Sequence, residues 1–131
     1  MPDPADIPRV LLGLARDDEL AARALLPVEG VTDAILGFHA QQTVEKSLKA
    51  VLALRGVEFP YTHDLDGLLE LCEKNGLDVP EALSNVDRLS PYGVQLRYGS
   101  ISPGDLDRDE ALRWAASAVE WAENIIEPTG D

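Results

Sequence analysis

The clearest pattern of apolar and polar positions lies between residues 32 and 55, where it predicts one long helix. The apolar side chains recur three, four and seven residues apart, as along one helix face; they are Phe38, Val44, Leu48, Val51 and Leu52. Thr32 occupies the N-cap position, and Gly56 stands where a left-handed C-cap is expected. Gln41 and Glu45 fall on the same apolar face. Because buried polar side chains need hydrogen-bond partners, another segment is expected to meet them.

Helical spacing is also found on both sides of this segment. Residues 6 to 26 repeat apolar side chains on one face, which Asp18 interrupts; the apolar members are Ile7, Val10, Leu11, Leu14, Ala21, Ala24 and Leu25. Asp6 is expected to cap this helix. A short helix begins after Thr62 or Asp64, either of which can cap it, and an Asn-Gly pair ends it.

Two pairs of acidic residues have the spacing of a capping box at a helix start. Asp78 and Glu81 predict a helix over roughly residues 79 to 90, and Asp107 and Glu110 predict a last helix. No segment alternates apolar and polar residues as a strand does. We therefore expect an all-α fold, an up-and-down bundle of four main helices plus a short extra helix.

The last predicted helix, which ends near Ile126, repeats alanine along its apolar face and so allows a neighbouring helix to approach closely. Trp114 and Trp121 lie seven residues apart on one flank of it. Core packing is the simplest interpretation of these residues. An oligomer interface is the alternative, because Trp is enriched at interfaces. Since symmetric pairs are the commonest assemblies, we expect a homodimer.

Composition limits the class of protein. The 131 residues suffice for one domain with one core, so we expect residues 1 to 131 to form a single domain. Its ends, at about residues 1 to 5 and 127 to 131, are expected to be loose. We expect no signal peptide and no membrane span, and the single Cys72 fits a reducing cytoplasm.

Charge bears on the ligand. The formal net charge is −13, which argues against unaided binding of a nucleic acid. The long predicted helix reverses this balance locally, since Lys46, Lys49 and Arg55 outnumber Glu45 between Phe38 and Gly56. Such lysines usually only solvate the outer face of a helix, and phosphate contact is the alternative.

The best candidate site is the pair Arg97-Tyr98, in a segment bounded by Pro and Gly. An Arg presents a planar fork to phosphate or carboxylate, and a Tyr ring stacks on a base. Arg97 is equally suited to a structural ion pair with Glu45 or Asp18, and both roles can hold at once. The segment over residues 90 to 104 is expected to be irregular, with at most a turn of helix.

Gln41 and Glu45 also allow two interpretations. Interior carboxylates often act as bases, but more often such a residue ties a loop to a helix, which we favour, with Arg97 as its basic partner. His39 and His63 are too few for a metal cluster, so we expect no metal or other cofactor. We expect His63 to help start the short helix.

Residues 38 to 71, FHAQQTVEKSLKAVLALRGVEFPYTHDLDGLLEL, resemble the HEPN domain (higher eukaryotes and prokaryotes nucleotide-binding). The shared pattern is a small residue, Gln-Gln, Glu-Lys and Leu-Lys, then Arg-Gly and Thr-His-Asp-Leu. Residues 14 to 26 fit as well, and Arg97-Tyr98 fits a place where family members commonly show Arg-Tyr-Pro. The resemblance implies a helical bundle that commonly dimerises. Prokaryotic stand-alone members often work beside a minimal nucleotidyltransferase, as toxin and antitoxin or a related pair.

Active members of this family are metal-independent ribonucleases whose motif is an Arg, a polar residue and, after a short gap, a His. Carried over, the Arg is Arg97, but positions 102 to 104 are Ser, Pro and Gly. Tyr98 replaces the polar residue, and Gly99 replaces the Pro. The incomplete motif favours binding over catalysis, so we expect a nucleotide- or RNA-binding partner of a minimal nucleotidyltransferase. The alternatives are an endoribonuclease toxin with an altered active site and a purely structural dimeric scaffold.

The expected ligand site is the cleft between the long helix and residues 90 to 104. The contacting residues are expected to be Arg97, Tyr98 and Lys49, and the supporting ones Glu45 and Gln41. A mononucleotide or an RNA end suits so acidic a chain better than a long strand does. Salt should weaken the binding, because phosphate contacts release counterions.

Overall fold

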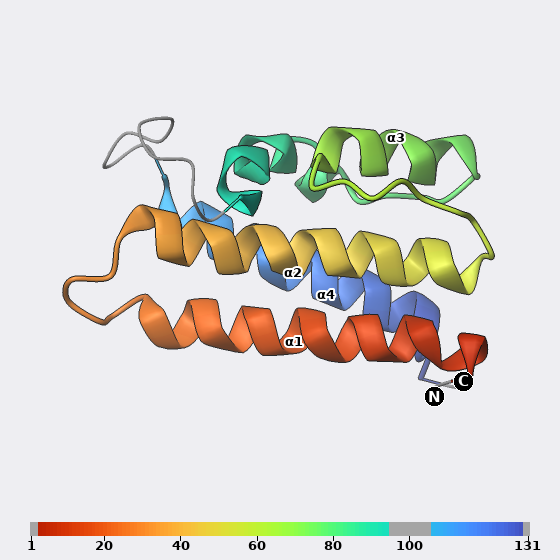
Figure 1. Ribbon diagram of the computed structural model, residues 1–131, viewed down its shortest axis with the longest axis horizontal. Helices are drawn as coiled ribbons and strands as arrows, with labels where there is room; N and C mark the ends of the chain where they lie inside the picture. The colour runs from red at the N-terminus through yellow and green to blue at the C-terminus, as the bar shows by residue number, and fades with distance from the viewer. Residues whose placement is uncertain (1–2, 95–105, 130–131) are drawn as a thin grey trace.

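The computed structural model describes residues 3–94 and 106–129, and every regular element in that part of the chain is helical. The elements are η1 (Pro4–Asp6), α1 (Ile7–Leu25), α2 (Asp33–Leu54), α3 (Leu65–Lys74), η2 (Glu81–Leu83), η3 (Val86–Gly93) and α4 (Arg108–Ile126), where η marks a 3₁₀ helix. The long helices α1, α2 and α4 lie lengthwise against one another, and α3 with η3 covers another side of α2 (Figure 1). The predicted all-α bundle is confirmed.

Helix α2 is the centre of this arrangement, since it contacts α1, α3, η3 and α4. Thirteen of its 22 residues are buried. Its ends are set locally, as predicted. The Thr32 hydroxyl accepts a hydrogen bond from the Ile35 amide at 3.3 Å, and Gly56 adopts a φ of +70° just after the helix.

Helix α1 has the predicted length but turns a different face to the core. Ile7, Val10 and Leu14 of the predicted face are 43 to 49% exposed. The buried positions include Leu12, Ala15 and Ala22 instead; the two alanines allow the close approach of α2 and α4. Asp6 stands at the N-cap position but makes no side-chain capping bond. The predicted face is therefore wrong at Ile7, Val10 and Leu14, which remain on the surface, whereas Leu11 of the same face is partly buried against the core.

The helix predicted over residues 79 to 90 is not formed, and two 3₁₀ helices, η2 and η3, take its place. The buried side chains here follow one another every third residue; they are Leu83, Val86, Leu89 and Tyr92. That spacing matches the 3.0 residues per turn of a 3₁₀ helix, which places positions i and i+3 on one line. The predicted capping box is also wrong, because Pro80 is the N-cap residue of η2 and no side chain caps it.

The remaining caps are confirmed. Asp64 accepts from the Asp66 amide at 3.2 Å at the start of α3, and Asp107 accepts from the Glu110 amide at 3.0 Å at the start of α4. Trp114 and Trp121 are both buried within the chain, so this flank of α4 is core and gives no argument for a dimer. None of the helices described has the length and apolar composition that a membrane span requires.

Candidate functional site

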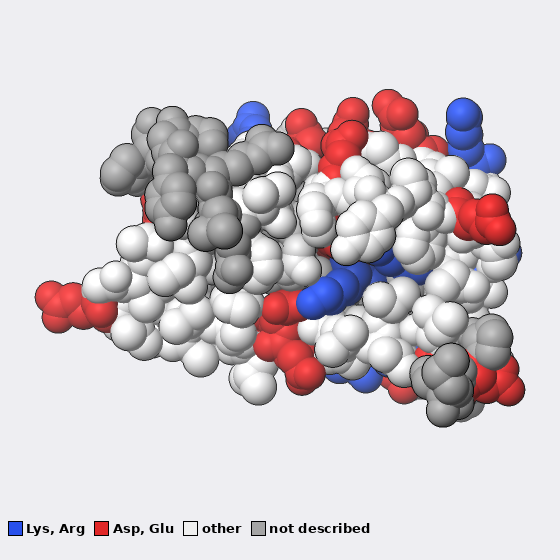
Figure 2. Space-filling view, in the orientation of Figure 1, with Lys and Arg blue, Asp and Glu red and all other residues white. Residues whose placement is uncertain are grey.

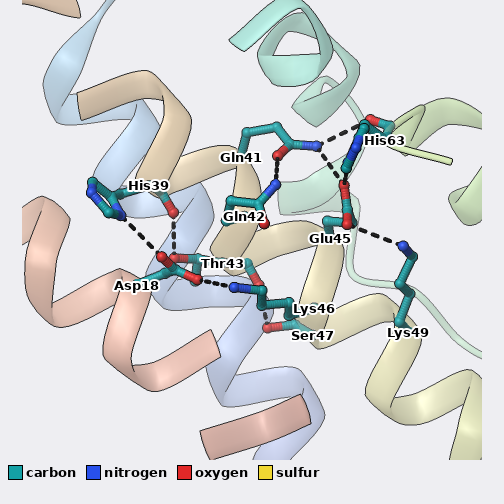
Figure 3. Close-up of polar contacts among 10 residues, drawn as sticks. All are labelled: Asp18, His39, Gln41, Gln42, Thr43, Glu45, Lys46, Ser47, Lys49 and His63. Carbon is teal, nitrogen blue, oxygen red and sulfur yellow. Dashed lines mark hydrogen bonds and ion pairs between the residues drawn. The ribbon is translucent and has the colours of Figure 1, made fainter. Parts of the chain in front are cut away.

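A cluster of polar side chains lies where α2 meets the loop before α3 (Figure 3). At its centre is the carboxylate of Glu45, whose side chain is only 6% exposed. Its Oε1 accepts from Nε2 of Gln41 at 3.0 Å and pairs with Nδ1 of His63 at 2.8 Å. Its Oε2 accepts from Nζ of Lys49 at 3.1 Å. Three donors therefore satisfy a carboxylate that burial would otherwise make costly.

Helical spacing explains the α2 part of this cluster, because Gln41, Glu45 and Lys49 follow one another at intervals of four residues. A chain of amides fixes the loop against them. Nε2 of Gln41 also donates to the main-chain carbonyl of His63 at 3.0 Å, and Nε2 of Gln42 donates to Oε1 of Gln41 at 2.7 Å. We call Gln41, Gln42, Glu45, Lys49 and His63 the Glu45 cluster.

The close approach of η3 to this cluster depends on Gly93. A Cβ atom at that position would lie 2.8 Å from the amide carbon and nitrogen of Gln41. Only a residue without a side chain allows the 3₁₀ helix to pack on the buried amide. The end of η3 is therefore placed directly over the polar cluster.

Aromatic rings accompany the lysine. Nζ of Lys49 lies 5.6 Å from the ring centroid of Phe59 and 5.9 Å from that of Tyr61, within cation–π range. The Lys49 side chain is only 12% exposed, whereas Tyr61 is 99% exposed. The Tyr61 ring meets the His63 ring edge-on, with centroids 6.3 Å apart. A cation, an imidazole and a solvent-exposed aromatic ring thus lie together.

A surface pocket adjoins the cluster. Its volume of about 470 Å³ is within the size range of small-molecule sites. We call it the His63 pocket; it is lined by Tyr61, Thr62, His63, Asp64, Ser90, Pro91 and Val94. The Ser90 hydroxyl accepts from the Leu65 amide at 3.1 Å, which ties η3 to the start of α3. The pocket therefore lies between two segments that are themselves joined.

The hydrogen-bond pattern assigns the tautomer of His63. Because the Glu45 carboxylate acts as an acceptor, Nδ1 of His63 carries the hydrogen between them. In the neutral ring this leaves the lone pair on Nε2. Within residues 3–94 and 106–129, no hydrogen-bond partner is found for Nε2. The side chain is 43% exposed and lines the pocket.

A second polar cluster, centred on Asp18, lies elsewhere along α2 (Figure 3). Asp18 of α1 pairs with Nδ1 of His39 at 2.9 Å and accepts from Nζ of Lys46 at 2.6 Å. This cluster ties α1 to α2. Lys46 is therefore engaged with Asp18 of α1, whereas Lys49 is engaged with Glu45 in the Glu45 cluster.

The structure thus brings together three of the five residues proposed from sequence, Gln41, Glu45 and Lys49. Glu45 is interior, as expected, and its basic neighbours are Lys49 and His63. Arg97 and Tyr98 lie outside the described residues, as do positions 102 to 104, so the ion pair from Arg97 to Glu45 stays a prediction. In the described part of the chain, no three metal-ligand side chains come together.

Sequence reasoning missed the role of His63. It assigned this residue to the start of the short helix, whereas the ring pairs with Glu45. The available signal was the partner that Glu45 required and the position of His63 at the end of a loop leading back to α2. Nothing in the spacing distinguished His63 from His39 as that partner.

Comparison with known proteins gives one match. A family model described as the HEPN domain matches residues 9–130, a range that includes the whole Glu45 cluster. Neither the curated proteins nor the solved structures gave a match. The resemblance seen in residues 38 to 71 is confirmed by the family model.

Proposed function

Because the chain belongs to the HEPN domain family, we propose that it binds a nucleotide or the end of an RNA at the Glu45 cluster and the adjoining His63 pocket. One observation carries the proposal. A single buried carboxylate holds an ammonium and an imidazole beside a pocket with an exposed aromatic ring at its edge. Charge, hydrogen bonding and stacking are thus available within one small site.

Each part of a nucleotide has a matching group. Lys49 uses one of its three N–H groups on Glu45, which leaves donors for a phosphate oxygen. The exposed Tyr61 ring offers a stacking surface, and stacking on an aromatic ring contributes about 1–3 kcal/mol per base. Asp64 lines the pocket and repels phosphate. We therefore expect the base or sugar inside the pocket and the phosphate on the Lys49 side.

The overall charge favours a short ligand. Uncharged residues cover most of the face drawn in Figure 2, and acidic side chains lie largely along its edges, with basic and acidic groups meeting near its centre. A net charge of −13 repels a long polyanion. A mononucleotide or an RNA end delivered by a partner carries fewer charges than a long strand and is repelled less. Arg97 and Tyr98 remain part of this proposal on the sequence pattern alone.

The partner belongs to the proposal as well. We infer that the chain works as a homodimer beside a minimal nucleotidyltransferase in a toxin–antitoxin-like module in the cytoplasm. The exposed apolar side chains Ile7, Val10 and Leu14 of α1 support an association surface. Recovery of a nucleotidyltransferase with the tagged protein from its native host tests the partner. A monomer in sedimentation at micromolar concentration contradicts the homodimer.

Binding is tested by titrating nucleotides and short RNAs into labelled protein and following NMR shifts. Replacing Lys49 by Gln should weaken binding about tenfold, a change of roughly 1.4 kcal/mol that matches the loss of one charge-assisted hydrogen bond. Lys46→Gln is the matched control, because Lys46 lies on the same helix but pairs with Asp18. If no ligand shifts the signals of Lys49, Tyr61 or His63, the cluster is structural and the proposal is wrong.

A further inference from the structure

The wall of the His63 pocket that leads into α3 offers hydrogen-bond acceptors and few donors. We propose that this wall selects a guanine base, whose edge carries N–H donors at N1 and at the 2-amino group. The inference deepens the proposed function and rests on it, because the base belongs to a nucleotide or RNA end bound at the same cluster. It makes Asp64, which caps α3, a specificity-determining residue as well.

The main-chain amides at this wall are already engaged. The amide of Asp64 donates to the Thr62 hydroxyl at 3.0 Å, and the amide of Leu65 donates to the Ser90 hydroxyl at 3.1 Å. The amide of Asp66 donates to Oδ1 of Asp64 at 3.2 Å. Free amides at a helix start bind anions. Because these three are bonded to side chains, the wall is poorly suited to a phosphate.

Acceptor atoms of the same wall remain open. An ionised carboxylate offers about four lone pairs. In the described part of the chain, Asp64 uses only Oδ1, for the bond from the Asp66 amide. A Cβ at Gly67 would lie 3.3 Å from Oδ2 of Asp64, so the missing side chain leaves this oxygen uncovered. The neutral His63 ring adds the lone pair of Nε2. The wall therefore favours a ligand edge that carries N–H groups.

Guanine matches this wall better than the other common bases. Its N1–H and its 2-amino group lie side by side, so one carboxylate can accept hydrogen bonds from both. Adenine and cytosine place an acceptor nitrogen beside the amino group, and uracil places a carbonyl on each side of its N3–H. Each of these bases therefore sets a lone pair against the carboxylate. An ionised Asp64 cannot donate to that lone pair, and the mismatch disfavours the three bases.

The other groups at the pocket fit the same base. The Tyr61 ring is 99% exposed, so it is available for stacking. The hydroxyls of Thr62 and Ser90 also line the pocket, and within residues 3–94 and 106–129 neither donates its own hydrogen. Such a hydroxyl can donate to the O6 carbonyl, which stands on the same edge of guanine. The wall thus supplies a partner for each polar atom of that edge.

Calorimetric titration of wild-type protein with nucleoside 5′-monophosphates tests the selection. GMP should bind at least about tenfold more tightly than AMP, CMP or UMP. IMP lacks the 2-amino group and 1-methyl-GMP lacks the N1 hydrogen, so each should bind about tenfold more weakly than GMP, as expected for one lost hydrogen bond to a charged group. Equal affinities would overturn the guanine selection and leave the proposed binding function standing. Absence of binding by every nucleotide would overturn both.

Asp64→Asn tests the residue directly. Asn caps a helix as well as Asp does, so α3 should keep its start. The amide replaces one acceptor by a donor, which suits xanthine, where a carbonyl stands in place of the 2-amino group. The variant should bind GMP about tenfold more weakly than wild type and XMP more tightly. AMP binding should not weaken, because the lost charge repels its phosphate.

Asp66→Asn is the matched control, because it removes the same charge from the first turn of α3 at a position that does not line the pocket. It should keep the wild-type ratio of GMP to AMP affinity. An equal loss for GMP and AMP in Asp64→Asn would mean that the carboxylate only supports the pocket. A loss of preference in Asp66→Asn would mean that charge alone sets it. Either result overturns the inference.

A last titration separates a base from a protein side chain. The guanidinium of arginine carries N–H donors in a similar row, so the amide of N-acetyl-arginine serves as the probe. It should bind at least about tenfold more weakly than GMP, because it has neither a ring to stack nor a phosphate for Lys49. Binding as tight as that of GMP would show that the wall recognises an arginine of a partner protein, and it would overturn the assignment to guanine.

Discussion

Replacing Glu45 by alanine removes the acceptor that three donors share, and we expect it to lower the free energy of unfolding by about 3 kcal/mol. The side chain is buried and lies between α2 and the loop before α3. Alanine keeps the helix, because its helix propensity exceeds that of glutamate. The loss therefore reports the interactions of the carboxylate and not a local effect on α2.

The three donors do not contribute equally to this figure. Nε2 of Gln41 keeps its hydrogen bond to the carbonyl of His63 at 3.0 Å, and the half-exposed His63 ring can turn to water. The unpaired donors of these two side chains therefore add little to the loss of stability. The Lys49 side chain is only 12% exposed, so its ammonium stays largely desolvated. Removing one partner of a buried ion pair costs about 3–5 kcal/mol, and the partial exposure of Lys49 and His63 places the expected loss at the lower end.

Urea unfolding followed by far-ultraviolet circular dichroism measures this loss, with unchanged m values as the sign of unchanged native and unfolded states. Glu45→Gln keeps the shape and one carbonyl acceptor, so it should cost about 1–2 kcal/mol. Lys49→Met should cost less in the Glu45→Ala background than in wild type, with a coupling of about 1–3 kcal/mol. Equal midpoints for wild type and Glu45→Ala, or no coupling with Lys49, would show that the carboxylate is solvated and refute the reasoning.

Three further substitutions test the packing. Gly93→Ala should destabilise the fold by about 1–3 kcal/mol, because the added Cβ meets the Gln41 amide at 2.8 Å, whereas Gly13→Ala in α1 meets nothing within 4 Å and should stabilise by about 0.5–1 kcal/mol. Urea midpoints decide both, and a neutral Gly93→Ala would show that η3 is not held against that amide. Burial raises the pKa of the Cys72 thiol from 9.0 to about 12. The unfolded chain releases this proton at lower pH than the native chain, so stability should fall as pH rises from about 9 towards 12. Cys72→Ala should reduce the loss of stability between about pH 9 and 12. An equal loss in wild type and Cys72→Ala would contradict the prediction.

The predictions that succeeded rest on neighbouring residues. Thr32, Asp64 and Asp107 cap their helices through bonds within three residues, and such bonds depend little on the rest of the fold. The requirement that Glu45 find a partner also followed from one helix face. Local spacing and elementary burial costs were sufficient in each case.

The predictions that failed depend on which surfaces meet. Helix α1 carries two faces on which apolar side chains recur, and packing against α2 and α4 buried the one containing Ala15 and Ala22. The three-residue repeat from Leu83 onward fits a 3₁₀ helix but was interpreted at α-helical spacing. The choice of His63 as partner of Glu45, and the different partners of Lys46 and Lys49, arise from contacts between segments that no spacing reveals.

The placement of α2 between two sets of neighbours has a consequence for hydrogen exchange. Helices α1 and α4 contact α2 and each other, whereas α3 and η3 reach the rest of the bundle chiefly through α2. The layer formed by α3 and η3 can therefore open while α1, α2 and α4 stay packed. Its amides should exchange at a lower opening free energy than those of α2. The loop that carries His63 leads directly into α3. A ligand that binds at this loop should therefore slow the hydrogen exchange of the α3 amides.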